Sequence, residues 1–485
     1  MDPFITATEL GAAIARRQLS SLEALEACLE RVSAFDPPIN AVVALDKEGA
    51  RAAARAADEA LARGQARGPL HGVPMTIKDS FETAGLLTVC GTPALAHHVP
   101  RTDADAVARL RAAGAVVFGK TNCPLMAGDV QTYNDVYGTT NNPWDLERTP
   151  GGSSGGAAAA LAAGMTPLEL GSDIGGSIRT PAGFCGLYGH KSSWGVVPMR
   201  GHIPGPPGAL SVADLAVAGP LARSAEDLGS ALGVLAAPGR WDAVAWRLEL
   251  PAPRATELRE FRVAAWLDDP ACPVDAAVGE RLQAVVEALR AAGVCVEADA
   301  RPAVSLAEAV DAYVPLLGAV IGSGLPLEVY EGLKQLTADA EADEDTPFLR
   351  FARALTVSAR ERASRSEQRE HHRAAWAAFF ERYDVLLAPI TAVPAIAHDH
   401  RDPMQARVIS VEGAERSYLD LFSWIAPATA ALLPATAAPA GLTPGGLPVG
   451  VQIIGPYLED RTTIAFAQAL ERLVGGFTPP PSQAA

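Results

Sequence analysis

The strongest constraint on the fold is an amphipathic helix that leads through a single glycine into a short apolar strand. Residues 103–113 carry apolar side chains at helical spacing, Gly114 ends the helix, and residues 115–118 are uniformly apolar. A helix followed at once by a strand buried on both faces is typical of a sheet covered by helices. A second apolar run, residues 73–77, is followed directly by Lys78. The pattern predicts an α/β fold.

The character of the chain changes twice along its length, which predicts a middle lobe of its own. Pro251 and Pro253 suggest a linker, and residues 281–292 and 307–334 have helical patterning. The expected segments are N-terminal helices (1–65), a core (66–236), a mostly helical variable lobe (237–371) and the C-terminal part of the core (372–485).

Two helix starts near the N-terminus carry a local signature. Thr6 precedes Glu9 by three residues, and Ser20 precedes Glu23 by the same spacing. In a capping box the serine or threonine accepts from the N3 amide, while the glutamate accepts from the N-cap amide. The spacing therefore predicts helices that begin directly after Thr6 and Ser20.

The net charge of this 485-residue chain disfavours negatively charged binding partners. The chain has 56 acidic and 40 basic residues, so its formal net charge is −16. Such a surface repels phosphate backbones and anionic lipid, which predicts no nucleic acid and no membrane partner. The longest uncharged stretch, residues 423–458, contains six prolines and therefore predicts buried strands and turns instead of a spanning helix.

The remaining composition favours a cytoplasmic protein without a metal site. The N-terminus lacks the basic start and apolar run of a secretory signal. None of the six cysteines forms a CxxC pair, so we expect reduced thiols. No His/Cys group has zinc-ligand spacing, and neither a metal nor another cofactor is expected.

The chemistry is concentrated in residues 150–193, where two serines lie inside glycine clusters. Ser153 lies in GGSSGG and Ser177 in IGGSIR. Glycine permits positive φ and close backbone approach, so such a loop can direct several N–H groups at one point. Fixed N–H donors stabilise the oxyanion that develops when a nucleophile attacks a carbonyl carbon. The segment predicts acyl-transfer chemistry.

A serine nucleophile needs a base, and two residue types compete for that role. None of the nine histidines has a sequence context that marks it as a triad member. Lys78 ends an apolar strand, and burial would lower the pKa of its amine enough for it to act as a base. On strand position alone, a surface lysine or an ion pair with Asp79 is the simpler interpretation.

Seven motifs together resemble the amidase signature family. They cover residues 66–235 and 375–473 but leave the middle lobe uncovered. In chain order they are GVPMTIKDSFETAGL (72–86), GKTN (119–122), PGGSSGG (150–156), GSDIGGSIRTPAGFCGLYGHK (171–191), DLAVAGPLARSAEDL (214–228), FFERYDVLLAP (379–389) and GLPVGVQIIG (446–455).

The resemblance implies a fold, a triad and a reaction. The fold is one large α/β domain with a central mixed, twisted sheet flanked by helices. The base is Lys78, the proton relay is Ser153 after a cis peptide bond, and the nucleophile is Ser177, which forms an acyl-enzyme during amide hydrolysis. The implied oxyanion hole consists of the N–H groups of Ile174, Gly175, Gly176 and Ser177. The implied supporting residues are Ser154, Asp173 and Arg179.

The resemblance limits the substrate to a range of classes but does not identify one of them. Members of the family cleave aliphatic, aryl and fatty amides, cyclic oligoamides and, in some cases, carbamates. After GKTN the sequence looks more like the branch that acts on synthetic and cyclic amides. We expect a small-molecule amide or carbamate (urethane) as substrate and a monomer or homodimer. The residues expected to contact it are Met126, Asp129, Gln131 and Tyr133.

Three alternatives stay open. The family also contains an amidotransferase subunit that works with partner proteins on charged transfer RNA. Residues 152–156 match G-x-S-x-G, which would make Ser154 the nucleophile of an α/β-hydrolase esterase. Glycine-rich loops also bind phosphates, but residues 183–192 miss the P-loop pattern because His190 separates Gly189 from Lys191.

Overall fold

One large sheet runs through the computed structural model, which describes residues 1–205, 207–341 and 346–481. Within these ranges eleven strands form a single mixed sheet. In spatial order they are β1 (Val42–Leu45), β3 (Val116–Thr121), β2 (Pro74–Lys78), β6 (Leu168–Asp173), β8 (Val217–Ala222), β7 (Tyr188–Lys191), β14 (Ala435–Leu442), β15 (Pro448–Ile454), β11 (Val385–Pro389), β9 (Val263–Ala265) and β10 (Val296–Glu297). The expected α/β fold with a central mixed sheet is confirmed.

The direction of the strands changes along the sheet. β3, β2 and β6 are parallel neighbours, and so are β11, β9 and β10, while the other adjacent pairs are antiparallel. Every residue of β2, β3 and β6 is buried. Parallel strands covered on both faces read as continuous apolar runs, which is the pattern that the sequence predicted at 73–77 and 115–118.

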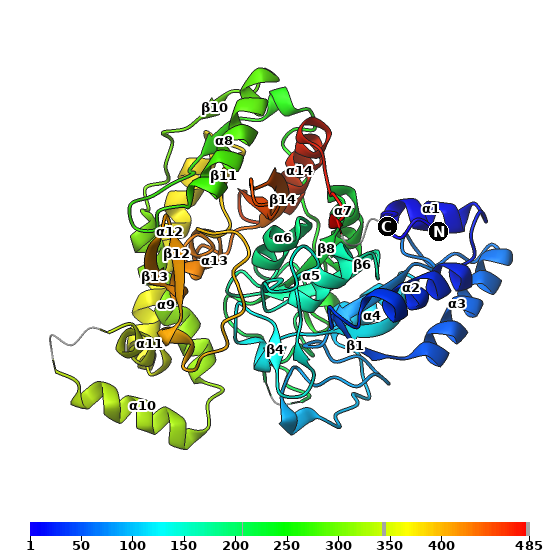
Figure 1. Ribbon diagram of the computed structural model, residues 1–485, viewed down its shortest axis with the longest axis horizontal. Coiled ribbons are helices and arrows are strands. Elements are labelled where there is room, and N and C mark those ends of the chain that lie inside the picture. The colour runs from blue at the N-terminus through cyan, green and yellow to red at the C-terminus, as the bar shows by residue number, and fades with distance from the viewer. Residues whose placement is uncertain (206, 342–345, 482–485) are drawn as a thin grey trace.

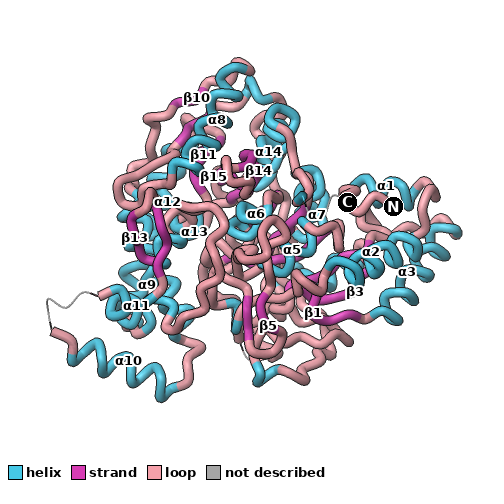
Figure 2. Tube along the Cα trace, in the orientation of Figure 1, coloured by secondary structure: helices cyan, strands magenta, loops and turns pink. Residues whose placement is uncertain are grey.

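Helices pack against the sheet along its length, with α5 against β6, α7 against β8 and α14 against β14 (Figure 1). Figure 2 shows α1, α2 and α3 on one side of the molecule and α9, α10 and α11 on the opposite side. Apart from α9 to α12, the helices are α1 (Ala7–Ala15), α2 (Ser21–Phe35), α3 (Lys47–Ala62), α4 (Asp105–Ala112), α5 (Gly155–Ala162), α6 (Arg179–Cys185), α7 (Ala225–Leu235), α8 (Ala276–Ala291), α13 (Ala426–Ala430) and α14 (Asp460–Val474). The short strands outside the main sheet are β4 (Tyr133–Asn134), β5 (Gly138–Thr139), β12 (Val408–Val411) and β13 (Ala414–Ser417).

Both predicted capping boxes are confirmed. Thr6 Oγ1 accepts from the Glu9 N–H at 3.2 Å, and Glu9 Oε2 accepts from the Thr6 N–H at 3.1 Å. Ser20 and Glu23 form the same reciprocal pair at the start of α2. These helix starts need only contacts within four residues, which is why the sequence predicts them.

The middle region differs from its prediction in two ways. Within the described residues its helices are α8, which fits the patterning at 281–292, followed by α9 (Leu306–Gly322), α10 (Leu327–Asp339), α11 (Pro347–Leu355) and most of α12 (Ala359–Phe380). The helical patterning predicted for 307–334 is confirmed by α9 and α10, but the chain leaves the helical conformation between them, where Gly324 and Pro326 disfavour continuation. Residues 237–304 are also not an independent helical lobe, because their strands β9 and β10 join the main sheet beside β11.

The proline-rich stretch 423–458 folds as predicted into buried strands and turns. It contains α13, β14 and β15, and the last two are antiparallel neighbours in the sheet. Its apolar character is explained by burial on both faces of the sheet. No helix in the described part of the chain is both long enough and apolar enough to cross a membrane.

Candidate active site

The predicted site lies where the parallel strands β2 and β6 end. Ile77 pairs with Leu170 in the parallel register, so Lys78 at the end of β2 lies beside the last residues of β6. The carboxyl ends of parallel strands meet at one edge of a sheet, where ligands of α/β proteins commonly bind. The segments that follow the strands therefore converge on Lys78 from the same edge.

Lys78 is fully buried and has two serine neighbours. Its Nζ lies 2.6 Å from Ser153 Oγ and 2.9 Å from Ser172 Oγ. Burial lowers the pKa of this lysine to about 8, although nearby acidic groups oppose the shift. The structure thus brings two of the three predicted triad residues into hydrogen-bond contact. Lys78 does not lie at the surface, since it is fully buried, and the Asp79 carboxylate accepts from the N–H groups of Val89 and Cys90.

Ser172 is a functional neighbour that the sequence did not predict. It lies in β6, next to Asp173, and its Oγ is the second partner of the Lys78 amine. Two fixed hydroxyl neighbours restrict the rotation of the long lysine side chain. Only a motif comparison centred on Lys78 could have indicated Ser172, because nothing in its own spacing points to a lysine 94 positions earlier.

Ser153, the first glycine-flanked serine, comes directly after Gly152, whose backbone is tightly packed. The Gly152–Ser153 peptide bond is cis, as the resemblance implied. A Cβ atom on Gly152 would lie only 2.7 Å from the carbonyl oxygen of Asp129 and 2.7 Å from the Val130 carbonyl carbon, so only glycine fits there. The 129–130 backbone therefore packs directly beside Ser153.

Ser154 connects the two glycine-rich segments. Its N–H donates to the Ser177 carbonyl at 3.1 Å, and its Oγ donates to the Ser172 carbonyl at 3.3 Å. It lies at the start of α5 after a loop, whereas the nucleophile of an α/β-hydrolase follows a strand. The contacts of Ser154 therefore join the loop before α5 to β6 and to the Ser177 loop, and its position differs from that of an α/β-hydrolase nucleophile.

Ser177 lies in the loop between β6 and α6. Its side chain is the least buried of the three predicted triad residues, at 6 % exposure against 1 % for Ser153 and 0 % for Lys78. Gly176 has a φ of +86°, a conformation that favours glycine. The Gly176 N–H donates to Asp173 Oδ1 at 3.0 Å, so this one of the four predicted oxyanion donors already has a partner.

A buried ion pair holds the Ser177 loop in place. Asp173 and Arg179 form a two-point contact, at 2.9 and 3.0 Å, and both side chains are fully buried. Burial alone would raise the pKa of Asp173, but the Arg179 charge and several hydrogen bonds outweigh it and lower that pKa to about 2. Arg179 also donates to the Ile425 carbonyl and to Thr429 Oγ1, which connects the loop to α13.

Two of the four residues predicted to contact substrate share one partner. Arg407 is buried, and it donates to Asp129 Oδ2 at 2.6 Å and to the Tyr133 hydroxyl at 2.7 Å. The Tyr418 hydroxyl donates to Asp129 Oδ1 at 2.7 Å. The negative charge of Asp129 is therefore neutralised within the protein.

The other two predicted substrate contacts lie apart from that pair. Gln131 exchanges two hydrogen bonds with the Asp399 backbone, at 2.6 and 3.0 Å. Met126 packs against a separate apolar cluster that includes Cys90, Cys123 and Ile203. The structure therefore places Asp129, Gln131 and Tyr133 against segment 399–407, and Met126 elsewhere.

His190 and His202 are each bonded to residues other than Ser153 and Ser177. The His190 ring bonds to Thr436 Oγ1 at 2.9 Å and to Asp460 Oδ1 at 3.1 Å, so both of its nitrogens are engaged. His202 Nε2 lies 3.1 Å from Ser80 Oγ. Burial, followed by the charge of Lys78, lowers the pKa of His202 to about 3, so its ring is neutral and a weak base at working pH.

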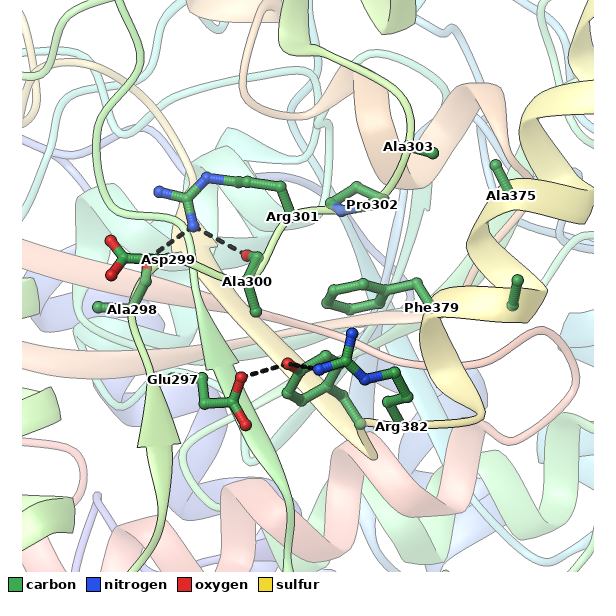
Figure 3. Close-up of a pocket in the computed structure, with 12 residues that line it drawn as sticks. Glu297, Ala298, Asp299, Ala300, Arg301, Pro302, Ala303, Ala375, Phe379 and Arg382 are labelled. Carbon is green, nitrogen blue, oxygen red and sulfur yellow. Dashed lines mark hydrogen bonds between the residues drawn. The ribbon is translucent and has the colours of Figure 1, made fainter.

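A surface pocket of about 650 Å³ lies away from these residues (Figure 3). It is formed between segment 297–303 and α12, with Phe379 on one wall. Two of its charged groups are already bonded to protein: Arg301 donates to three backbone carbonyls, and Glu297 accepts from the Tyr383 hydroxyl. The pocket contains none of the predicted site residues. Within the described ranges, no group of three or more His, Cys, Asp or Glu side chains could hold a metal ion.

Comparison with known proteins identifies the family. The amidase family model matches residues 23–464. The chain belongs to the amidase signature family. The match includes the middle region, so the resemblance extends further than the motifs at 66–235 and 375–473 indicated. The chain is therefore an enzyme that cleaves amide-type C–N bonds.

Members of the family with different activities match this amidase over nearly their whole length. It is 33% identical to the glutamyl-tRNA(Gln) amidotransferase A-subunit from Roseiflexus sp. strain RS-1, over 98% of this chain and 97% of that protein. A bacterial aryl acylamidase of the family superposes with a TM-score of 0.81 at 26% identity, covering 97% of this chain and 96% of that one. The 6-aminohexanoate cyclic dimer hydrolase in complex with substrate superposes with a TM-score of 0.78 at 26% identity, covering all of both chains.

Proposed function

We propose that this amidase hydrolyses small uncharged amides, including aryl and cyclic amides and aryl carbamates, through an acyl-enzyme on Ser177. The main observation in support of this proposal is the 2.6 Å contact between Lys78 Nζ and Ser153 Oγ, both of which are buried. A buried amine with a lowered pKa is neutral for part of the time at neutral pH and can accept a proton. No histidine is needed as the base.

The proposed reaction runs through the two serines in sequence. Neutral Lys78 takes the proton of Ser153 as Ser153 takes the proton of Ser177. The Ser177 oxygen attacks the carbonyl carbon, and the electron pair of the C=O bond moves to oxygen. Ser153 then returns a proton to the leaving nitrogen, the C–N bond breaks, and water hydrolyses the acyl-enzyme by the same relay.

The proposed oxyanion hole uses the loop amides from Ile174 to Ser177. Preorganised donors of this kind contribute about 3–4 kcal/mol each to the transition state. The Gly176 N–H bonds to Asp173, so its main part is to fix the turn, while the Gly175 and Ser177 N–H groups face the oxyanion. Asp173, Arg179 and Ser154 support this loop through the contacts described above.

The preference for an uncharged substrate rests on Asp129, a residue predicted to contact substrate, whose charge is already paired within the protein. Asp129 is paired with Arg407 and also accepts from Tyr418, so neither charge is free to bind the ammonium or carboxylate group of an amino acid. A neutral aryl or cyclic amide needs no such partner. The likeness to an aryl acylamidase and to a cyclic dimer hydrolase supports the same class.

A second candidate is an amidotransferase component that releases ammonia from glutamine for partner proteins. It is favoured by one observation, the 33% identity to an amidotransferase A-subunit over almost all of both chains. The two candidates differ in what the purified chain does alone. We therefore expect p-nitroaniline release from short acyl p-nitroanilides by the isolated chain, no ammonia release from L-glutamine, and measurable turnover in a panel of aryl urethanes. Ammonia from glutamine combined with inert anilides would contradict the proposal.

The pH dependence of kcat/KM tests the lysine base. Because Lys78 must be neutral, activity should rise with pH through about 8 and level off above it. At pH 6 the rate should be roughly 100-fold below the plateau, since each pH unit below the pKa lowers the neutral fraction about tenfold. The measurement is an anilide pH–rate profile from pH 6 to 10, with circular dichroism as the folding control. A flat profile, or a midpoint near 6.5 that disappears in His202→Gln, would contradict the assignment.

A further inference from the structure

The direction of an N–H group in the Ser177 loop is determined by the carbonyl of the same peptide. In a planar trans peptide the C=O and the following N–H point in opposite directions. The Thr180 N–H donates to the Gly176 carbonyl at 2.7 Å, so the Ser177 N–H of that peptide points the other way. One proposed oxyanion donor is therefore oriented by α6.

A side chain from the middle region holds the neighbouring peptide. The Tyr313 hydroxyl of α9 donates to the Ile174 carbonyl at 2.9 Å. The same peptide carries the Gly175 N–H, which therefore points away from Tyr313. Tyr313 is 1 % exposed, and burial raises the pKa of its phenol, so the hydroxyl stays protonated and remains a donor.

The packing around Gly175 leaves little freedom for this arrangement to change. A Cβ atom on Gly175 would lie 3.0 Å from a ring carbon of Phe422 and 3.3 Å from the Tyr313 hydroxyl. Both aromatic side chains therefore press against the same face of the loop. α9 itself packs on α13, which accepts two hydrogen bonds from Arg179.

We propose that Tyr313 is a positioning residue for the oxyanion hole, which holds the Ile174 carbonyl so that the Gly175 N–H faces the reacting carbonyl oxygen. The inference rests on the proposed function, because it assigns a role within that acyl-transfer site. It gives the middle helices a part in catalysis, since α9 and the Ser177 loop are 139 positions apart in the chain at this contact.

The test is Tyr313→Phe, which removes the hydroxyl and keeps the packed ring. We expect kcat to fall roughly tenfold, with KM within twofold, because one donor loses its orientation without being removed. A trifluoromethyl ketone gives a second readout. The Ser177 oxygen adds to its carbonyl carbon, the Ser177 proton passes to Lys78 through Ser153, and the carbonyl oxygen becomes the oxyanion. Its inhibition constant should rise by the same factor as kcat falls, while the Kd of a ground-state amide analogue stays constant.

The matched control is Tyr383→Phe, which removes the hydroxyl of another tyrosine with a low exposed fraction, bonded to Glu297 beside the surface pocket and away from the site. It should leave kcat and the inhibition constant unchanged. Wild-type values of both in folded Tyr313→Phe, beside an inactive Ser177→Ala, would overturn this inference alone. Full activity in Ser177→Ala would overturn the proposed function and this inference with it. If Tyr313→Phe does not fold, Gly175→Ala, whose added Cβ displaces the hydroxyl, is measured by the same two readouts.

Discussion

Replacement of Ser177 by alanine is expected to lower kcat for p-nitroanilide hydrolysis by a factor on the order of 10⁵, with little change in KM. Alanine removes the atom that forms the acyl-enzyme but leaves the loop amides and the substrate contacts in place. In serine hydrolases loss of the nucleophile removes most of the rate enhancement, and the residual rate comes from the oxyanion hole and binding. The measurement is steady-state and single-turnover release of p-nitroaniline.

The same experiment distinguishes a relay from three independent contributions. Ser153→Ala and Lys78→Ala should each be nearly as damaging as Ser177→Ala, and the triple variant should be no worse than the worst single one, because the three act as a unit. Ser192→Ala is the matched control, since Ser192 is equally buried but donates only to the Ala218 carbonyl. Activity that survives Lys78→Ala would rule out the lysine as base.

Replacement of Asp173 by alanine is expected to destabilise the protein by about 3–5 kcal/mol and to abolish activity. The substitution leaves the Arg179 guanidinium buried without its counter-charge, which is the costly way to break a buried ion pair. It also removes the acceptor of the Gly176 and Ile178 N–H groups, which fixes the Ser177 loop. Urea unfolding followed by tryptophan fluorescence measures the change in the free energy of unfolding.

The control for Asp173→Ala is Glu59→Ala. Glu59 pairs with Arg63 at 3.7 Å on an exposed helix face, so its loss should change stability by less than about 0.5 kcal/mol. Acidification should remove part of the stabilisation that ionised Asp173 provides. Because the pKa of Asp173 is lowered in the folded protein, its contribution is present above pH 4 and is lost as the pH falls toward 2. Equal stability of Asp173→Ala and Glu59→Ala would contradict a supporting role for the ion pair.

Local features of this protein could be predicted from the sequence because they depend on near neighbours. Both capping boxes need contacts over three residues, and the strand that ends at Lys78 is encoded by its own apolar run. The glycine clusters around Ser153 and Ser177 indicate tight backbone without any knowledge of the fold. These patterns predicted the fold class and the two glycine-rich serine loops, whereas the role of Lys78 was implied only by the family resemblance.

Strand membership in the middle region was not predictable in the same way. The runs that form β9 and β10 are three and two residues long, too short for a periodicity to distinguish from loop. They become strands because β11, more than 80 residues later, offers β9 a parallel edge. The break between α9 and α10 has a local cause, in Gly324 and Pro326, that helical patterning alone did not detect.

The sequence by itself indicated which segments are buried and where glycines make the backbone tight, and its resemblance to the family predicted which serines and which lysine carry the chemistry. Only the tertiary structure decided that Ser172 contacts Lys78, that Arg407 neutralises Asp129, and that Tyr313 holds the Ile174 carbonyl. Each of these contacts joins residues more than 90 positions apart, so no spacing along the chain records them. The parallel strands bring Ser172 beside Lys78, and α9 brings Tyr313 to the Ser177 loop, although these residues are far apart in the chain.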